Sequence, residues 1–208
     1  MNGYSVKLYV YDLSGGLASQ LSQSFIGKQI DGIWHTAVVV YGQEYFYGSG
    51  GICSCPPGTT MMGPPLRIEN MGTTHIPPAT FKEFLNEISP DYHTSQYNVM
   101  TNNCNNFTNV LLQFLTGDYT PDYILNLPQD VLATPLGQML LPTIEQMTTQ
   151  AQSQLPGMSG AMGVMYSVNE YAIPDVIEQT TVRDPVLGAP ADVSVKKTVI
   201  MNEDEDLD

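Results

Sequence analysis

The chain has 208 residues, with 7 lysines and arginines against 21 aspartates and glutamates, so its formal net charge is −14. That length suits one ordinary domain with an appendage. The acidic excess argues against nucleic acid and anionic lipid as partners, and no stretch approaches the roughly 18 to 20 apolar residues of a membrane-spanning helix.

Strand patterns dominate the first half of the chain. Apolar and polar or aromatic residues alternate over residues 6–11, which predicts a half-buried strand. Residues 36–41 and 45–48 are rich in β-branched and aromatic side chains, and the Gly-containing segment between them predicts a hairpin. Residues 50–65 hold four prolines and several glycines, which predicts a loop, and a strand is expected at 66–70.

The second half is mainly helical in pattern. Capping-box spacing from Thr80 to Glu83 and an apolar stripe predict a helix up to Ile88, and residues 97–101 are expected to be a strand. Apolar residues at helical spacing over 107–115 predict a buried helix that ends at Gly117, and a last helix over 128–141 should be interrupted by Pro135. The predicted class is α+β, with segregated helices.

Composition changes near residue 142. Residues 1–142 carry a net charge of −6, whereas residues 143–208 carry −8 and open with a Gln/Thr/Ser/Met/Gly-rich run. We therefore predict a folded domain over 1–142 and a low-complexity, acidic, mostly disordered tail over 143–208. Within the tail, residues 191–201 could add a strand.

One of the three cysteines stands where a helix is predicted to start. An odd number of cysteines and an N-terminus without a secretory pattern indicate a reduced intracellular setting. Asn102 or Asn103 is a favourable N-cap, which puts Cys104 in the first turn, where the helix dipole and free N–H groups stabilise a thiolate. The alternative is a buried structural cysteine, the usual fate of a free thiol.

A cysteine nucleophile needs a base, and the chain offers three histidines. His75 lies in a Thr/Pro loop and His93 follows a turn, so both are expected to be exposed polar residues. His35 lies at the start of the most apolar predicted strand, where packing can hold an imidazole in place. Without Cys104, it would be interpreted as a half-buried structural histidine.

Cys104 and His35 each lie in one of several distinctive sequence blocks. These blocks are VKLYVYDLS (6–14), GKQ (27–29), GIWHT (32–36), FYGSGGI (46–52), CPPG (55–58), NCNNF (103–107), FLTG (114–117), LP (127–128) and TPLGQ (134–138). Together they resemble the PPPDE superfamily, the permuted papain fold peptidases, and are similar to its desumoylating isopeptidases. The resemblance extends from about residue 6 to 142, and the sequence departs from close relatives at Cys53, where they have Ser.

The resemblance implies a circularly permuted papain-like fold with a Cys–His dyad, in which Cys104 is the nucleophile and His35 is the base. It further implies a homodimer that removes SUMO, or a related ubiquitin-like modifier, from lysines of target proteins in the cytoplasm and nucleus. Two alternatives stay open: a protein S-acyl thioesterase that uses the same dyad, and a non-catalytic adaptor for modified proteins.

No cofactor or metal is expected. The pair Cys53 and Cys55 has the wrong spacing for a zinc site and no second pair accompanies it. The glycine-rich segment 48–51 lacks the Lys-Ser/Thr ending of a phosphate-binding loop. We interpret it as a slender turn beside the dyad, which could accept the Gly-Gly end of a modifier.

Overall fold

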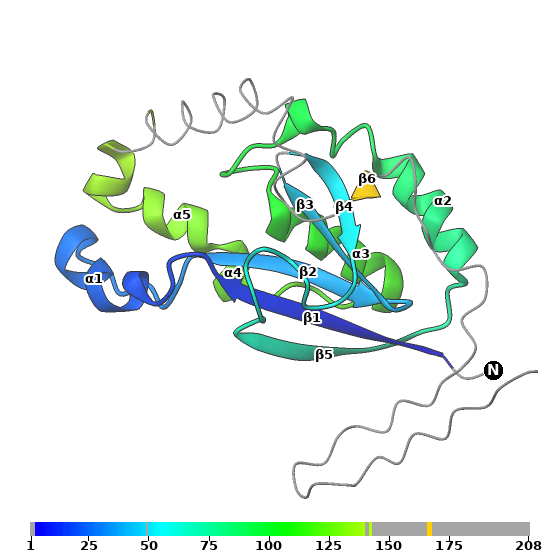
Figure 1. Ribbon diagram of the computed structural model, residues 1–208. Coiled ribbons are helices and arrows are strands. Elements are labelled where there is room, and N and C mark those ends of the chain that lie inside the picture. Colours follow the sequence, from blue (N-terminus) through cyan, green and yellow to red (C-terminus); the bar gives the residue numbers. More distant parts are fainter. Residues whose placement is uncertain (1–2, 49, 140–141, 143–165, 168–208) are drawn as a thin grey trace, which may run out of the picture. The chain divides into compact units, whose positions relative to one another are not determined.

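The computed structural model describes residues 3–48, 50–139, 142 and 166–167, all within the first of two structural units, Met1–Asp175 (Figure 1). The second unit, Val176–Asp208, and the strand expected at 191–201 lie outside the described residues. In the described part of the chain, no helix is long and apolar enough to cross a bilayer.

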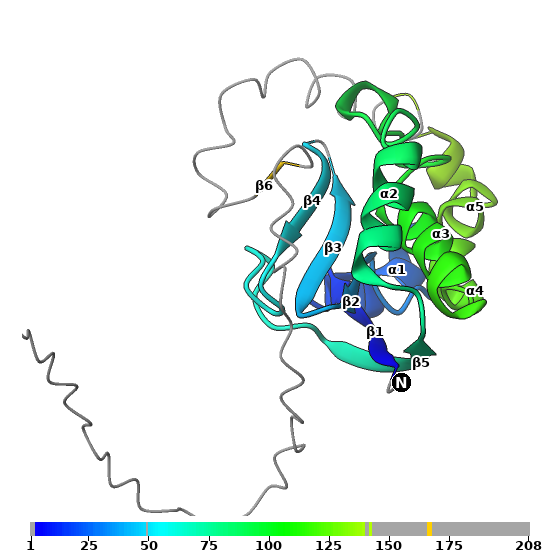
Figure 2. The ribbon, with the colours of Figure 1, turned by 90° about the vertical axis from the view of Figure 1, so that its right-hand side faces the viewer.

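The described residues form one antiparallel sheet with helices packed on one face, which confirms the α+β class (Figure 2). The chain order of the strands is broken once, because β5 returns to pair with β1 at one edge. In spatial order the strands are β5 (Arg67–Thr74), β1 (Tyr4–Asp12), β2 (Trp34–Val40), β3 (Gln43–Gly48), β4 (Gly51–Cys55) and β6 (Tyr166–Ser167).

The two sheet faces are buried by different means. Apolar residues at alternate positions of β1 and β2, such as Leu8 and Val38, pack with Phe81, Phe107 and Leu111 of the helices in the main core. The opposite face of the sheet carries a smaller cluster, in which Met62 of the loop after β4 packs against buried strand residues. These strand residues are Tyr11, Ala37, Phe46, Cys53 and Cys55.

The central helix α3 (Cys104–Thr116) lies against the sheet and has defined caps at both ends. Gly117 adopts a positive φ of 78° and donates its N–H to the carbonyls of Leu112 and Gln113, so the helix ends where predicted. The other helices are α1 (Leu17–Ile26), α2 (Pro78–Ile88), α4 (Asp122–Leu125) and α5 (Leu127–Leu132).

Several predicted elements are confirmed with shifted bounds. The β2–β3 hairpin turns at Tyr41-Gly42, both at positive φ, which is the geometry of a tight turn that matches strand twist. Helix α2 begins at Pro78, before the predicted capping box. Pro135 separates α5 from a further helical segment at 135–139, as the sequence predicted.

Two local predictions were wrong, and one helix was missed. Part of the predicted loop 50–65 is strand β4, which pairs in register with β3 and is buried throughout. Residues 97–101 form a tight turn instead of a strand, closed by a single bridge between Asn98 and Asn102. Helix α1 was not predicted; glycines flank it and Ser22 is its one buried residue, so it lacks the apolar stripe that reveals α3.

Candidate active site

The start of α3 is a capping box that places Cys104 in the first turn of the helix. Asn103 is the N-cap: its side chain accepts the backbone N–H groups of Asn105 and Asn106, and the Asn106 side chain accepts the Asn103 N–H. Of the two N-cap residues that the sequence left open, the structure therefore selects Asn103. Cys104 is the first helical residue, as predicted.

Asn105 clamps this helix start onto strand β2. Its buried amide donates to the Trp34 carbonyl (3.0 Å) and accepts the Thr36 hydroxyl (2.9 Å). The Thr36 hydroxyl also bonds to that of Thr108, one turn further along α3 (2.6 Å). These contacts hold the two residues on either side of His35 against the residue that follows Cys104.

The Cys104 thiol is buried but surrounded by donors. Its side chain donates weakly to the Asn105 amide oxygen (Sγ–Oδ1 3.6 Å). Burial raises the pKa of Cys104 to about 11, against the lowering effect of hydrogen bonds from the Thr36, Asn105 and Cys104 N–H groups and the Tyr97 hydroxyl. The expected thiolate-stabilising groups are therefore present, but burial outweighs them and the resting group is a thiol.

His35 lies on β2 with its ring on the face opposite to Thr36, because side chains alternate along a strand. The imidazole packs between the rings of Tyr11 and Phe46, with centroids 6.0 and 5.9 Å away. Burial lowers the pKa of His35 to about 4, so the ring is neutral near pH 7. Among the described residues, no group is hydrogen bonded to its buried Nε2.

The structure brings the two candidate residues to adjoining positions without a hydrogen bond between their side chains. Pairing between β2 and β3 begins at Val38, so the edge of β2 beside His35 is not paired with β3; the start of α3 contacts it instead. The Thr36 N–H donates to Cys104 Sγ, so the thiol lies one peptide unit from the imidazole-bearing residue. The Cys–His dyad itself stays a prediction.

The sequence did not reveal a buried carboxyl group that bonds to Tyr11, one of the two rings that contact His35. Glu44 is fully buried on β3 and accepts the Tyr11 hydroxyl and the Gly58 N–H, each at 2.7 Å. Burial raises the pKa of Glu44, although both hydrogen bonds oppose that rise. The Tyr11 ring that packs on His35 is thereby fixed at its hydroxyl end. The sequence signal was weak, since a single Glu beside a turn is normally exposed.

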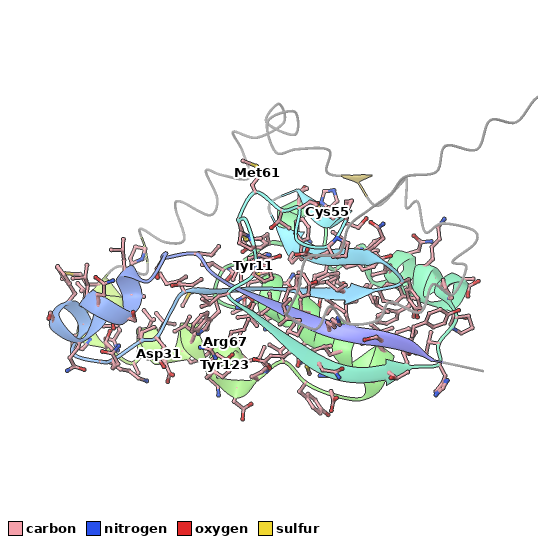
Figure 3. All side chains as sticks on the ribbon, turned by 60° about the horizontal axis from the view of Figure 1, so that its bottom comes forward. Tyr11, Asp31, Cys55, Met61, Arg67 and Tyr123 are labelled. Atoms are coloured by element: carbon pink, nitrogen blue, oxygen red, sulfur yellow. The ribbon has the colours of Figure 1, made fainter. Side chains whose placement is uncertain are left out.

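Two further groups fix the peptide next to His35. The Arg67 guanidinium stacks over the rings of Trp34 (5.4 Å) and Tyr123 (5.6 Å), and Figure 3 shows Arg67 beside Tyr123. Asp12 accepts the N–H of Ile33 (3.0 Å) and four groups in all. Burial alone would raise the pKa of Asp12, but these hydrogen bonds outweigh it and the pKa is lowered.

The remaining histidines are exposed, and the remaining cysteines lie in the smaller cluster, whose Tyr11 and Phe46 also contact His35. His75 and His93 are exposed, as expected, and the His93 ring accepts the Ser95 N–H to cap a short 3₁₀ helix, Thr94–Gln96. Cys53 and Cys55 are buried on β4 in the smaller cluster. In the described segments, no group of three His, Cys, Asp or Glu side chains could hold a metal ion.

With this geometry in place, comparison with known proteins defines the class. Residues 4–145 match the family described as "PPPDE putative peptidase domain", and the chain belongs to this peptidase family. That match confirms the resemblance inferred from the sequence blocks.

Similar proteins of known name cover most of the chain. Desumoylating isopeptidase 1 of Homo sapiens is 48% identical over 159 residues, which cover 76% of this chain and 92% of the human protein. The proteins of the same name from Rattus norvegicus and Xenopus laevis are 47% and 45% identical, and cover 72% and 70% of this chain and 89% and 86% of their own lengths.

Proposed function

We propose that this protein is a cysteine isopeptidase that removes SUMO from lysine side chains of target proteins, with Cys104 as nucleophile and His35 as base. The observation that carries the proposal is the likeness to desumoylating isopeptidases over nearly their full length, a likeness that includes the segment in which both residues lie. The clamp between Asn105 and strand β2 supports the two assignments, because it holds the candidate nucleophile against the strand of the candidate base.

The resting protonation states suit a dyad that is activated when substrate binds. A neutral imidazole can accept a proton, and a buried thiol can supply one. His35 Nε2 also has no partner in the described structure, which costs free energy unless a partner arrives. We propose that the ring turns towards the β3-facing edge of β2, which the start of α3 contacts, and pairs there with Cys104.

The reaction then proceeds in two halves. His35 takes the proton of Cys104, and the thiolate attacks the carbonyl carbon of the modifier's terminal glycine, whose oxygen becomes an anion. Collapse breaks the bond to the lysine nitrogen, which takes the proton from His35 and leaves a thioester on Cys104. Water, deprotonated by His35, attacks that thioester and releases the modifier and the free thiol.

The turn between β3 and β4 is where we propose that the Gly-Gly end of the modifier enters. Tyr47, the residue before Gly48, packs against Tyr97 (5.1 Å), whose hydroxyl contacts Cys104. The turn therefore lies beside residues that reach the nucleophile. A Cβ atom at Gly48 would meet no other atom within 4 Å, so there is open space beside Gly48.

A cleavage assay on three substrates tests the proposal. The protein and its Cys104→Ala variant are incubated with a SUMO–lysine isopeptide, a ubiquitin–lysine isopeptide and a palmitoylated cysteine peptide. We expect the wild type alone to cleave the SUMO isopeptide. Palmitate release without SUMO cleavage would assign the protein as a thioesterase. Equal behaviour of both proteins on all substrates would assign it as an adaptor.

We further propose that the protein acts as a homodimer in the cytoplasm and nucleus. Leu13, Ile33 and Leu66, next to the His35 end of the sheet, expose large apolar side chains that a second copy could cover. Its three cysteines are free, in keeping with a reducing compartment. Light scattering should give twice the chain mass, and the Ile33→Lys variant should have a lower measured mass.

The location in the cytoplasm and nucleus is tested by imaging a fluorescent fusion of the protein in cells.

A further inference from the structure

Tyr97 is the one tyrosine whose hydroxyl is hydrogen bonded to the Cys104 sulfur in the described part of the chain. It precedes α3 by seven positions and is partly buried beside the main core. The mechanism above assigns it no role, and neither did the sequence analysis. Its contact with the candidate nucleophile therefore calls for a chemical explanation.

The turn between Tyr97 and Cys104 is built to hold the two residues together. Asn98 and Asn102 exchange backbone hydrogen bonds (3.0 and 2.9 Å), and the Asn98 side chain accepts the N–H groups of Met100 and Thr101. The Asn103 side chain, which caps α3, also donates to the Val99 carbonyl (2.8 Å). The turn is thereby tied to the first residue of the helix start.

The ring of Tyr97 is held from the other side. It packs against the ring of Tyr47, with centroids 5.1 Å apart, and Tyr47 packs in turn on Phe107 of α3 (6.0 Å). A ring fixed by packing and a backbone fixed by the turn leave the hydroxyl little freedom. Such a group is preorganised, and preorganised donors give the largest electrostatic stabilisation in active sites.

We propose that Tyr97 is a catalytic residue of the reaction proposed above, one that donates a hydrogen bond first to the Cys104 thiolate and then to the oxyanion. This inference rests on the proposed function for its substrate, but the contact between Tyr97 and Cys104 does not. The role is that of a donor throughout, so Tyr97 keeps its proton in every step.

The donor follows the negative charge as the bonds change. When His35 takes the thiol proton, the charge lies on Sγ and the phenol hydrogen bond stabilises it. As the new S–C bond forms, the sulfur lone pair becomes that bond and the carbonyl π pair moves to oxygen. The oxyanion lies next to the sulfur, within reach of the same hydroxyl. Collapse returns the pair to the carbonyl and expels the lysine nitrogen.

The surroundings of Tyr97 suit a neutral donor rather than a base. Burial raises the pKa of Tyr97, and the nearby Cys104 charge raises it further. The phenol therefore stays protonated near neutral pH, which a hydrogen-bond donor requires.

Tyr97→Phe tests the role, with Tyr41→Phe as the matched control. The control removes another tyrosine hydroxyl of the main core, one that donates to the Ile76 carbonyl (2.7 Å) beyond the opposite end of β2 from Thr36. We expect Tyr97→Phe to lower kcat for the SUMO isopeptide about 100-fold with little change in KM, as loss of an oxyanion donor does. Tyr41→Phe should stay within threefold of wild type.

A second measurement needs no modifier. The rate of Cys104 alkylation by iodoacetamide at pH 8 should fall about fivefold to tenfold in Tyr97→Phe, because the thiolate loses a donor. Wild-type rates of alkylation and of cleavage in Tyr97→Phe would overturn the inference and leave the proposed function intact. If iodoacetamide alkylates Tyr97→Phe slowly but the wild type cleaves no SUMO conjugate, the proposed function is overturned and the contact between Tyr97 and Cys104 is retained.

Discussion

The two sides of strand β2 are held by different forces. On the α3 side, Thr36 and Asn105 form a hydrogen-bonded clamp in which each polar group has a partner. On the other side, His35 is held by ring contacts with Tyr11 and Phe46, and its Nε2 has no partner among the described residues. The proposed nucleophile is thus fixed by directional bonds, and the proposed base by packing.

This difference matters for a dyad. Directional bonds fix the position of Cys104, because each satisfied bond would have to break before the helix start could move. Ring packing restrains His35 without a hydrogen bond to its Nε2 in the described structure, so that nitrogen is available to a partner. In the proposed dyad, the nucleophile therefore stays in place and the base completes the arrangement.

The largest effect should come from removing either dyad member. We expect Cys104→Ala and His35→Asn each to lower kcat/KM for the SUMO isopeptide at least about 10⁴-fold, because the two groups act as one unit. The double variant should be no worse than Cys104→Ala alone. His93→Ala, a change at an exposed histidine, should stay near wild type. Additive losses would show that the residues act independently.

The clamp is tested by replacing its central amide. Asn105→Leu leaves the buried Trp34 carbonyl without its donor, so the free energy of unfolding should fall by about 3 to 4 kcal/mol in urea denaturation. The control is Asn106→Ala, which removes one capping-box bond and should cost about 1 kcal/mol. Equal losses in the two variants would mean that the clamp adds nothing beyond helix capping.

The burial of His35 between Tyr11 and Phe46 is tested by the pH dependence of the free energy of unfolding. The folded-state pKa of His35, about 4, lies below its ordinary 6.5, so the unfolded state binds more protons between these values. The stability that neutral His35 contributes is therefore complete above pH 6.5 and is lost as pH falls towards 4. Between pH 7.5 and 4, wild type should lose about 3 kcal/mol relative to His35→Asn, in which Glu44 still titrates.

The smallest effect should come from the hydrogen bond between Tyr11 and Glu44. Tyr11→Phe keeps the ring that contacts the imidazole and removes one hydrogen bond to Glu44, so we expect about 2 kcal/mol of lost stability and less than a threefold change in kcat. Tyr9→Phe, two residues earlier on β1, should change stability by less than about 0.5 kcal/mol. A large fall in kcat for Tyr11→Phe would mean that the hydroxyl positions His35 directly.

Local chemistry made some features predictable from the sequence. The N-cap, the first-turn position of Cys104 and the end of α3 at Gly117 depend on neighbouring residues, and the structure confirms all three. Strand β4 was missed because the prolines and glycines around it are typical of loops, whereas its strand conformation depends on pairing with β3. Long-range pairing overrode local propensity there.

Contacts across the fold could not be predicted. Asn105 looks like a polar residue of a helix start, and nothing near it in the chain shows that its amide reaches Trp34 and Thr36. Glu44 and Arg67 have typical surface side chains, yet one is fully buried and the other stacks on Trp34. The position of Cys104 at a helix start indicated a stabilised thiolate, whereas burial raises the pKa of the thiol. That burial comes from residues distant in the chain, which the local sequence does not reveal.

The most direct test of the nucleophile is covalent trapping. SUMO in which propargylamine replaces the terminal glycine is incubated with the wild type and with Cys104→Ala, and adducts are mapped by peptide mass spectrometry. We predict a single adduct on Cys104 of the wild type and none on the variant, although Cys53 and Cys55 remain in it. An adduct on either β4 cysteine, or cleavage of the SUMO isopeptide by Cys104→Ala, would contradict the account.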